Sequence, residues 1–428
     1  MSQTADRMIS NNTSLLPSVN GIELASARLS QVIINTPLVT SAHLSQFHGA
    51  DISLKREDLQ RIRSFKLRGA YNKISKMPAE KRARGVVTAS AGNHSQGVAF
   101  ACAALGVQAK IFMPASTPLQ KIDQTKNYGA DFVEIVLTGD TFDEAYAEAL
   151  YYQQKNHATM VHPYDDVDVI EGQGTVALEI LQSADRKIDF LFFPVGGGGL
   201  AAGLASYFKA LSPETVLIGV EPEGAASMRA SFNAGKNTGL ESIDNFIDGA
   251  AVKRSGDLGF LVCKDTLDHL VAVPEGKVCK TLLGLYNREG MVVEPAGALS
   301  IAALDMFSDL IKGKHAVCIV SGGNNDIART EEIKERALLY EGRKHYFVVN
   351  LEQRAGALKA FLLDVLGPED DIVHFEYTKK TNRHHGPVVV GIETASDASL
   401  SCLRKRMDKV GIRYEYLNNR ESLFGVLV

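Results

Sequence analysis

A lysine set between apolar residues is the first group in this sequence that could form a covalent bond. Lys66 lies in the segment Ser64–Ala70, which reads SFKLRGA. Apolar neighbours remove water from an amine, which lowers its pKa and favours the neutral, nucleophilic form. Such a lysine can form a Schiff base with an aldehyde cofactor and later act as a base. By itself the segment is more typical of a solvated lysine at a helix start, so this chemistry needs support from elsewhere in the chain.

A turn between an expected strand at residues 85–90 and the helix after it is the second candidate. The turn consists of Ser90, Ala91, Gly92, Asn93 and His94. The first backbone N–H groups of a helix bind carboxylate or phosphate oxygens, and Asn93 can donate a hydrogen bond to an oxygen of a bound ring. A plain capped turn would explain the same residues, and a lone histidine such as His94 is more often a structural hydrogen-bonder than a catalyst.

Consecutive glycines form the third candidate, between an expected strand at 190–195 and an Ala-rich helix. The loop consists of Gly196, Gly197, Gly198, Gly199 and Leu200. Such a loop lets the backbone wrap a phosphate at the positive end of a helix. We interpret it as an anion site, because glycines cost conformational entropy and these serve no evident packing purpose. A rival interpretation is a dinucleotide fingerprint made by Gly196, Gly198 and Ala201, with Glu221 ending the next strand. This dinucleotide interpretation would leave the Lys66 segment and the Ser90–His94 turn without a function.

Ser321 opens a fourth loop, Ser-Gly-Gly-Asn-Asn, after the apolar strand expected at 315–323. A serine hydroxyl there could face a pyridine nitrogen. Unlike an aspartate, a neutral hydroxyl does not hold that nitrogen protonated, so the ring is a weaker electron sink and prompt loss of a β-leaving group is favoured. The alternative is one more glycine-rich turn.

The elements that must position these loops alternate between short apolar strands and longer helices. Strands are expected at 85–90, 109–116, 131–136, 190–195, 216–222 and 315–323. Strands that are apolar throughout and separated by helices indicate parallel sheets buried on both faces, with ligands at the strand C-termini. The region is therefore predicted to be α/β.

The C-terminal region follows a different order, βαββαβ, which is that of a ferredoxin-like α+β unit. Strands are expected at 345–351, 371–380, 386–395 and 413–418, and helices at 354–367 and 399–411. We expect a flexible segment at 1–25, a catalytic domain at 26–328, a linker helix at 329–344 and a regulatory domain at 345–428.

Composition narrows the class of protein. The net charge of -4 over 428 residues offers no general attraction for nucleic acid. The five cysteines are scattered singly, which is typical of reduced thiols in a cytoplasmic protein. The first twenty residues have neither the apolar core of a signal peptide nor an Arg-rich transit pattern, and no run of about 20 apolar residues predicts a membrane span.

The four loops together resemble the threonine dehydratase (threonine deaminase) family of the tryptophan-synthase-β-like, fold type II pyridoxal-phosphate enzymes. The resemblance covers roughly residues 30–345. It rests on LKREDLQ at 54–60, SFKLRGA at 64–70, SAGNHSQG at 90–97, GGGGL at 196–200 and SGGN at 321–324.

The resemblance implies that Lys66 carries pyridoxal 5'-phosphate, that Asn93 bonds the ring hydroxyl and that Ser321 meets the pyridine nitrogen. It places the cofactor phosphate on the Gly196–Leu200 loop and the substrate carboxylate on the Ser90–Ser95 turn. The implied reaction turns L-threonine into 2-oxobutanoate and ammonia, the first step of isoleucine biosynthesis, with Lys66 removing the Cα proton.

The C-terminal unit resembles a single ACT-like regulatory domain of biosynthetic threonine dehydratases. Arg354 and Gly356, at the start of its first helix, are where such domains bind an amino acid. The resemblance implies feedback by isoleucine, and the alternative is a unit that only mediates oligomerisation. Enzymes of this group usually form homo-oligomers, and we expect a homotetramer. Ser227 stands where a racemase-like metal site would place an aspartate, so no divalent metal is expected, while a monovalent ion stays open.

Two other functions stay open from the sequence. One is a serine dehydratase or serine racemase with the same cofactor, since threonine and serine differ by one methyl group and both can react. The other is a non-catalytic amino-acid-binding regulatory protein, which would have no chemical need for Lys66, Asn93, the glycine loop and Ser321 together.

Overall fold

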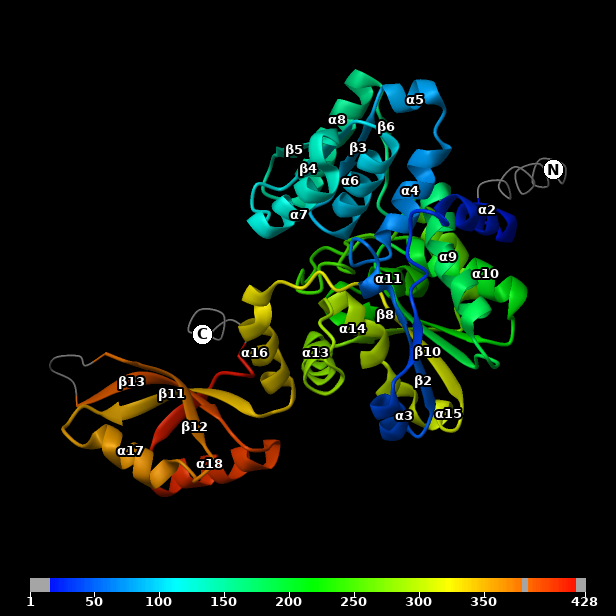
Figure 1. Ribbon diagram of the computed structural model, residues 1–428. Coiled ribbons are helices and arrows are strands. Elements are labelled where there is room, and N and C mark those ends of the chain that lie inside the picture. The colour runs from blue at the N-terminus through cyan, green and yellow to red at the C-terminus, as the bar shows by residue number, and fades with distance from the viewer. Residues whose placement is uncertain (1–15, 379–383, 421–428) are drawn as a thin grey trace, which may run out of the picture. The chain divides into compact units, whose positions relative to one another are not determined.

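The computed structural model describes residues 16–378 and 384–420 (Figure 1). The chain divides into a first unit, Met1–Ile327, and a second unit, Ala328–Val428. Within the described residues no helix is long and apolar enough to span a membrane.

The first unit contains two sheets. The larger one has the order β1-β2-β10-β7-β8-β9, with β1 antiparallel and all other neighbours parallel. Its strands are β1 Leu38–Thr40, β2 Asp51–Arg56, β7 Phe190–Pro194, β8 Val216–Pro222, β9 His269–Val273 and β10 His315–Val320. The smaller sheet is parallel throughout, in the order β5-β4-β3-β6. Its strands are β3 Val86–Ala89, β4 Ala109–Met113, β5 Val133–Leu137 and β6 Thr159–Met160.

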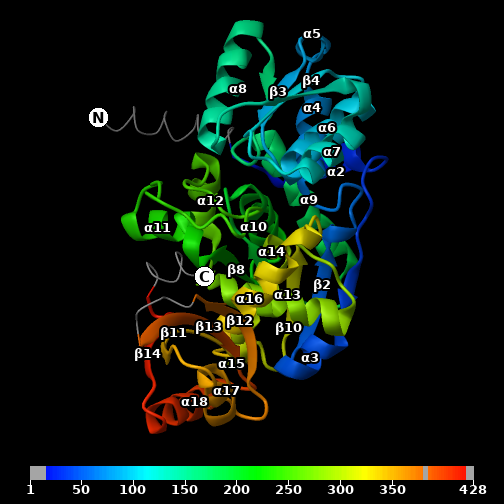
Figure 2. The ribbon, with the colours of Figure 1, turned by 90° about the vertical axis from the view of Figure 1, so that its left-hand side faces the viewer.

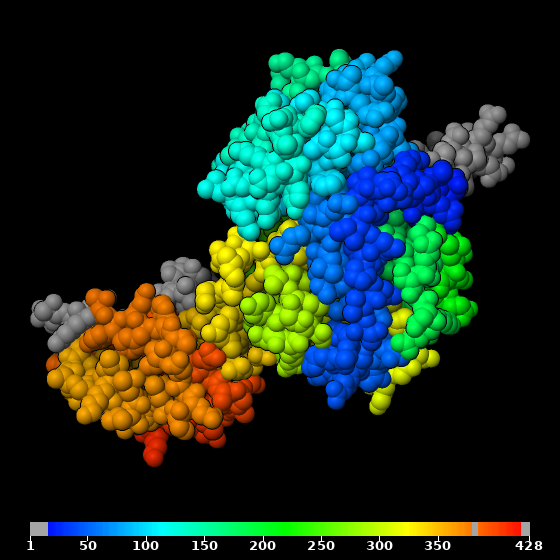
Figure 3. All heavy atoms as spheres, in the orientation of Figure 1, coloured from blue at the N-terminus to red at the C-terminus, as the bar shows by residue number. Residues whose placement is uncertain are grey.

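Helices cover both faces of each sheet, as expected for strands that are apolar on both sides. They are α2 Val19–Leu29, α3 Ala42–His48, α4 Lys66–Lys76, α5 Ala79–Ala83, α6 Asn93–Leu105, α7 Leu119–Gly129, α8 Phe142–Asn156, α9 Val167–Ser183, α10 Gly199–Leu211, α11 Ser227–Ala234, α12 Asp257–Thr266, α13 Glu275–Glu289, α14 Pro295–Ala302 and α15 Ser308–Ile311. Short 3-10 turns lie at Glu57–Leu59, Ala130–Phe132, Glu223–Ala225 and Leu304–Phe307. The residues that form the smaller sheet and its helices, mostly cyan in Figure 3, make a lobe of their own within this unit.

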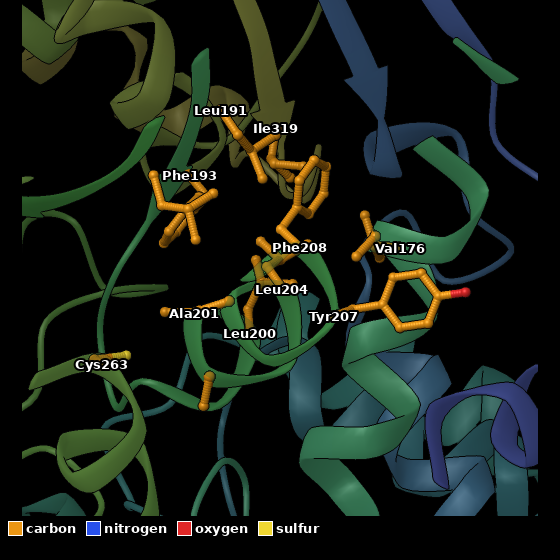
Figure 4. Packing of buried hydrophobic residues seen from close by; sticks show 14 of the residues in the cluster. Val176, Leu191, Phe193, Leu200, Ala201, Leu204, Tyr207, Phe208, Cys263 and Ile319 are labelled. Atoms are coloured by element: carbon orange, nitrogen blue, oxygen red, sulfur yellow. The ribbon is translucent and has the colours of Figure 1, made fainter. Parts of the chain in front are cut away.

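The main core lies between the larger sheet and α10. Figure 4 shows Leu191 and Phe193 of β7 and Ile319 of β10 near Leu204 and Phe208 of α10, and all five side chains are fully buried. Burying an aliphatic or aromatic side chain of this size contributes about 1.5–3 kcal/mol. This packing fixes the C-terminal ends of β7 and β10, which carry the glycine loop and Ser321.

Close helix packing fixes the start of α4. A Cβ at Gly172 of α9 would lie 2.6 Å from the carbonyl oxygen of Arg68, so only glycine lets α9 approach α4 this closely. The Arg68 side chain is fully buried and donates to Glu57 at 2.8 Å and to Glu179 at 2.6 Å. Lys55 donates to the same Glu179 at 2.5 Å. The positive charges of Lys55 and Arg68 thus balance the negative charges of Glu57 and Glu179. These ion pairs hold the helix turn that begins with Lys66.

The expectation of a flexible segment over residues 1–25 is wrong for its last part. Helix α2 begins at Val19, because the Ser18 hydroxyl accepts a hydrogen bond from the backbone of Gly21 and caps the helix. Ile22 and Leu29 are fully buried and anchor α2 to the first unit. Residues 1–15 lie outside the described part of the chain.

The second unit is an antiparallel sheet in the order β12-β13-β11-β14. Its elements are α16 Thr330–Tyr340, β11 Lys344–Glu352, α17 Ala357–Val365, β12 Asp371–Tyr377, β13 His385–Glu393, α18 Asp397–Lys409 and β14 Arg413–Tyr416, preceded by a 3-10 turn at Ile327–Arg329. Helices α17 and α18 cover one face, as Figures 1 and 2 show. Leu339 of α16 packs against the other face.

The α/β fold with two sheets and the α+β unit with a ferredoxin-like strand order are therefore as the sequence predicted. Helix α17 starts at Ala357 rather than at 354, because Gly356 at its N-cap has a left-handed backbone with φ +85°. The last residues of the strand expected at 371–380 lie outside the described residues.

Candidate active site

The loop before Lys66 is joined to the Ser321 loop by backbone hydrogen bonds. Phe65 N–H donates to Ser321 O at 3.2 Å, and Gly323 N–H donates to Arg63 O at 2.8 Å. Ser64 and Gly322 form an antiparallel bridge between them. Two segments far apart in the sequence therefore meet at the end of β10, and both of the residues expected to be catalytic, Lys66 and Ser321, lie there.

The Lys66 amine is suited to nucleophilic chemistry. Its Nζ donates a hydrogen bond to Pro163 O at 2.8 Å. Burial lowers the pKa of Lys66 to about 8, although the nearby Glu294 carboxylate acts in the opposite direction. A lysine with this pKa has a useful fraction of neutral amine near neutral pH.

The turn from Ser90 to His94 lies beside Lys66 because α6 packs against the start of α4. A Cβ at Gly97 would lie 3.1 Å from the Lys66 carbonyl carbon and oxygen. Gly92 is the N-cap of α6, and Ala91 before it packs against the core of the smaller sheet. The Ser90 hydroxyl accepts from Gly92 N–H at 3.2 Å. The structure thus brings this predicted site segment to Lys66.

Asn93 is held by two residues that the sequence did not single out. Its Nδ2 donates to the Glu294 carboxylate at 2.8 and 2.9 Å, and its Oδ1 accepts from Asn324 at 2.7 Å. Glu294 is buried at the N-cap of α14, and burial raises the pKa of its carboxyl to about 7. Asn93 is therefore part of a polar network within the site.

His94 is fixed inside the protein in its neutral form. Its Nε2 lies 2.9 Å from Val161 O, which makes Nε2–H the donor because a carbonyl only accepts. Burial lowers the pKa of His94 to about 3. Within the described residues Nδ1 is buried and has no hydrogen-bond partner. This arrangement fits a structural histidine that ties the turn to the end of β6.

The glycine loop connects β7 to the first residue of α10. Gly198 has φ +90°, and a Cβ at Gly197 would lie 2.2 Å from the ring of Tyr164. A Cβ at Gly196 would lie 2.8 Å from Ala250 O. The expectation that these glycines serve no packing purpose is wrong, because neighbouring chain fills the space that side chains would need. Leu200 is buried in the main core and anchors the start of α10.

One short segment touches both the lysine and the glycine loop. Pro163 O accepts from Lys66, and the next residue, Tyr164, packs on Gly197 and Gly199. The Tyr164 hydroxyl donates to Arg254 O at 3.3 Å. These contacts bring together four groups that could bind one ligand. They are the Lys66 amine, the glycine loop at the positive end of the 13-residue helix α10, the Ser321 hydroxyl and the Asn93 amide.

These groups fit the chemistry of pyridoxal phosphate. Lys66 matches its aldehyde, the N-terminus of α10 matches its phosphate, and Ser321 and Asn93 offer hydroxyl and amide groups for its ring. Ser64, beside Ser321 and Lys66, has a buried hydroxyl without a hydrogen-bond partner in the described residues, as a site built for a further polar group would have.

Glu221, which the dinucleotide interpretation required, is engaged elsewhere. Its carboxylate accepts from Met228 N–H at 2.7 Å and Arg229 N–H at 2.8 Å at the start of α11. The hydroxyl of Ser227 is buried without a hydrogen-bond partner among the described residues. Among all the residues that the structure describes, no group of three or more His, Cys, Asp or Glu side chains could hold a metal ion.

Little in the sequence pointed to Glu294 and Asn324. Glu294 precedes Pro295 and has the pattern of an ordinary helix start. Asn324 stands in the recognised SGGN segment but offers no signal of its own. Arg354 and Gly356, the predicted effector residues, belong to the second unit, where they line a pocket of about 340 Å³.

Comparison with known proteins identifies both units. Residues 29–322 match the model of pyridoxal-phosphate-dependent enzymes, and residues 335–427 match that of the C-terminal regulatory domain of threonine dehydratase. The protein from Halalkalibacterium halodurans described as L-threonine dehydratase biosynthetic IlvA is 51% identical over 410 residues, which are 96% of this chain and 99% of that protein. The Bacillus subtilis protein of the same description is 52% identical over 413 residues, or 96% and 98%.

Solved structures agree with these matches. The processed form of threonine deaminase isoform 2 from Solanum lycopersicum is 39% identical with a TM-score of 0.70, covering 76% of this chain and 95% of that chain. Serine racemase from Dictyostelium discoideum is 29% identical with a TM-score of 0.67, covering 73% and 99%. The chain therefore belongs to the pyridoxal-phosphate-dependent enzymes and, within them, to the biosynthetic L-threonine dehydratases.

Proposed function

We propose that this enzyme converts L-threonine to 2-oxobutanoate and ammonia, the first step of isoleucine biosynthesis. The observation that carries the proposal is the partly buried Lys66 amine, with its pKa of about 8, beside the glycine loop and Ser321. It is supported by the 51% identity to a protein described as a biosynthetic L-threonine dehydratase.

Each residue then has a part that its surroundings allow. When bound, pyridoxal phosphate withdraws electrons from the Cα–H bond of the substrate. The Gly196–Leu200 loop would hold its phosphate, Asn93 its ring oxygen and Ser321 its ring nitrogen. Lys66 would attach the cofactor and, once released by the substrate, remove the Cα proton. Pro163 O keeps the amine in place, since it accepts from Nζ at 2.8 Å.

The segment of Ser90, Ala91, Gly92, Asn93 and His94 would bind the substrate carboxylate. The first N–H groups of α6 point toward the start of the helix, where an anion is favoured. His94 would contribute by holding this turn to Val161. The neutral hydroxyl of Ser321 would favour rapid loss of the β-hydroxyl group over a long-lived carbanion.

The test is 2-oxo acid release by the cofactor-loaded enzyme from L-threonine and from L-serine. Faster turnover of threonine supports the proposal. A methyl group is worth about 1–3 kcal/mol in an apolar pocket, so slower turnover of serine is expected as well. Release from serine alone, or racemisation without 2-oxo acid, would favour a serine dehydratase or serine racemase, the second candidate that the likeness to a serine racemase structure supports.

We further propose that the second unit binds isoleucine as a feedback inhibitor, in the pocket at the start of α17. Leu358, Leu362 and Phe375 give it an apolar wall. Arg354 and Glu352, which form an ion pair, give it both charges that a zwitterionic amino acid requires. Gly356, which lies between these charged residues and Leu358 in the sequence, turns the chain there with its left-handed backbone.

Neighbouring leucines of α17 allow a matched test of this pocket. Leu362→Asp puts a charge on its apolar wall and should abolish inhibition by isoleucine while basal threonine turnover is kept. Leu363→Asp makes the same change at a side chain that is 71% exposed and outside the pocket, so inhibition should persist. Inhibition that survives Leu362→Asp would show that isoleucine binds outside this pocket, and a wild-type enzyme that isoleucine does not inhibit would favour a unit that only mediates oligomerisation.

We propose a cytoplasmic homotetramer with a catalytic domain that includes helix α2 and runs to residue 328, a linker helix at 329–344 and a regulatory domain at 345–428. Three buried free thiols, Cys102, Cys263 and Cys318, support a reducing compartment. Light scattering of the full chain would give the mass of the oligomer.

A further inference from the structure

A chain of side-chain amides runs through the active site and ends at Asn93. Gln96 Nε2 donates to Gln124 Oε1 at 3.0 Å, which leaves Gln96 Oε1 as an acceptor. Asn324 Nδ2 lies 3.0 Å from that oxygen, 2.7 Å from Asn93 Oδ1 and 2.9 Å from Ile62 O. Three oxygens therefore surround one amide nitrogen.

The backbone carbonyl of Ile62 decides which way every amide in this chain points. An amide side chain can turn over and exchange its oxygen and nitrogen, but a carbonyl can only accept. Asn324 must therefore turn its nitrogen to Ile62 O, and the same nitrogen then faces Asn93. Asn93 must therefore accept this hydrogen bond through Oδ1, so its Nδ2 points away from Asn324.

The Glu294 carboxylate accepts a hydrogen bond from Asn93 Nδ2 and so fixes the second end of this amide. Both carboxylate oxygens lie within 2.9 Å of Asn93 Nδ2. The two oxygens of one carboxylate are too close together to face both diverging N–H bonds of the amide, so one N–H is shared between them. The second N–H stays available to an acceptor in the site.

We propose that Asn324 and Glu294 are positioning residues that turn the Asn93 amide so that it donates to the cofactor ring oxygen. This inference rests on the assignment of Asn93 to the cofactor made above. Without Asn324, the Asn93 amide can turn over and present Oδ1 to an oxygen that itself accepts, which would be repulsive. Asn324 acts through Asn93, which is 231 positions away in the sequence, and does not itself bind the cofactor.

A double-mutant cycle on Asn93→Ala and Asn324→Ala tests this. The readouts are the dissociation constant of pyridoxal phosphate, from fluorescence titration of the full-length protein, and the absorbance maximum of the bound cofactor. A hydrogen bond to a charged acceptor corresponds to about ten- to hundredfold in affinity. We expect each single variant to weaken binding by about this factor and to shift the absorbance maximum in the same direction. The double variant should bind no more weakly than Asn93→Ala alone.

Independent effects that multiply in the double variant, or an Asn324→Ala variant with unchanged affinity and absorbance, would overturn the inference alone. If the wild-type protein did not bind pyridoxal phosphate, the proposed function would fail and the inference with it. Asn324→Asp, which keeps the shape and removes the donor, serves if the alanine variant does not fold, and it should shift the absorbance further. The control is Asn156→Asp, the same change at an exposed residue at the end of α8, which should change neither readout.

Discussion

The attachment of pyridoxal phosphate to Lys66 should follow the ionisation of an amine with a pKa of about 8. Only the neutral amine attacks an aldehyde. At pH 7 about 9% of such an amine is neutral, against about 0.03% for an unperturbed lysine, a gain of roughly 300-fold. The rate of attachment should therefore rise with pH and level off above a midpoint near pH 8.

Stopped-flow absorbance of cofactor-free protein mixed with pyridoxal phosphate measures this rate. The cofactor also titrates in this range, so each rate is divided by that of a blocked lysine free in solution at the same pH. The ratio should fall above about pH 8, because free lysine continues to gain neutral amine up to about pH 10. A ratio that stays constant with pH would mean that Lys66 behaves as an ordinary lysine whose pKa is not lowered.

Glu294→Gln extends this prediction. The Glu294 carboxylate opposes the effect of burial on the pKa of Lys66, so its neutralisation should move the midpoint of attachment below pH 8.

Three further changes test how the site and the second unit are built. Arg68→Met leaves Glu57 and Glu179 buried with one cation fewer and should lower the free energy of unfolding by about 3–5 kcal/mol, measured by urea denaturation followed by circular dichroism. Gly197→Ala places a Cβ 2.2 Å from the Tyr164 ring, so cofactor affinity should fall at least about tenfold in titration while the secondary structure is kept. Phe361→Ala empties a 1% exposed position in the core of the second unit and should cost about 3–5 kcal/mol there, seen as an earlier transition of this unit.

The fold and the main candidate site loops could be predicted from the sequence because both depend on local patterns. Strands buried on both faces are apolar throughout, as in HAVCIV of β10, and this alone indicates a parallel sheet covered by helices. Ligand loops of such sheets follow the C-terminal ends of the strands. Lys66, the glycine loop and Ser321 could therefore be proposed as site residues from residue type and position.

The partners of these residues could not be predicted, because tertiary packing brings them together. Glu294 is 201 positions from Asn93, and nothing in the sequence relates the two. The contact of Tyr164 with Gly197 likewise appears only when α9 and α10 are packed. Helix α2 was missed because the residues that precede it are mostly polar and its stability comes from burial of Ile22 and Leu29.

Borohydride reduction of the pyridoxal-phosphate-loaded protein, followed by peptide mass spectrometry, identifies the residue that holds the cofactor. Reduction makes the bond between the cofactor and its lysine permanent, so the modified residue can be read from the peptide. We expect the label on Lys66 alone, and we expect it to be lost together with threonine turnover in Lys66→Ala. A label on another lysine, or turnover retained in Lys66→Ala, would show that Lys66 does not carry the cofactor.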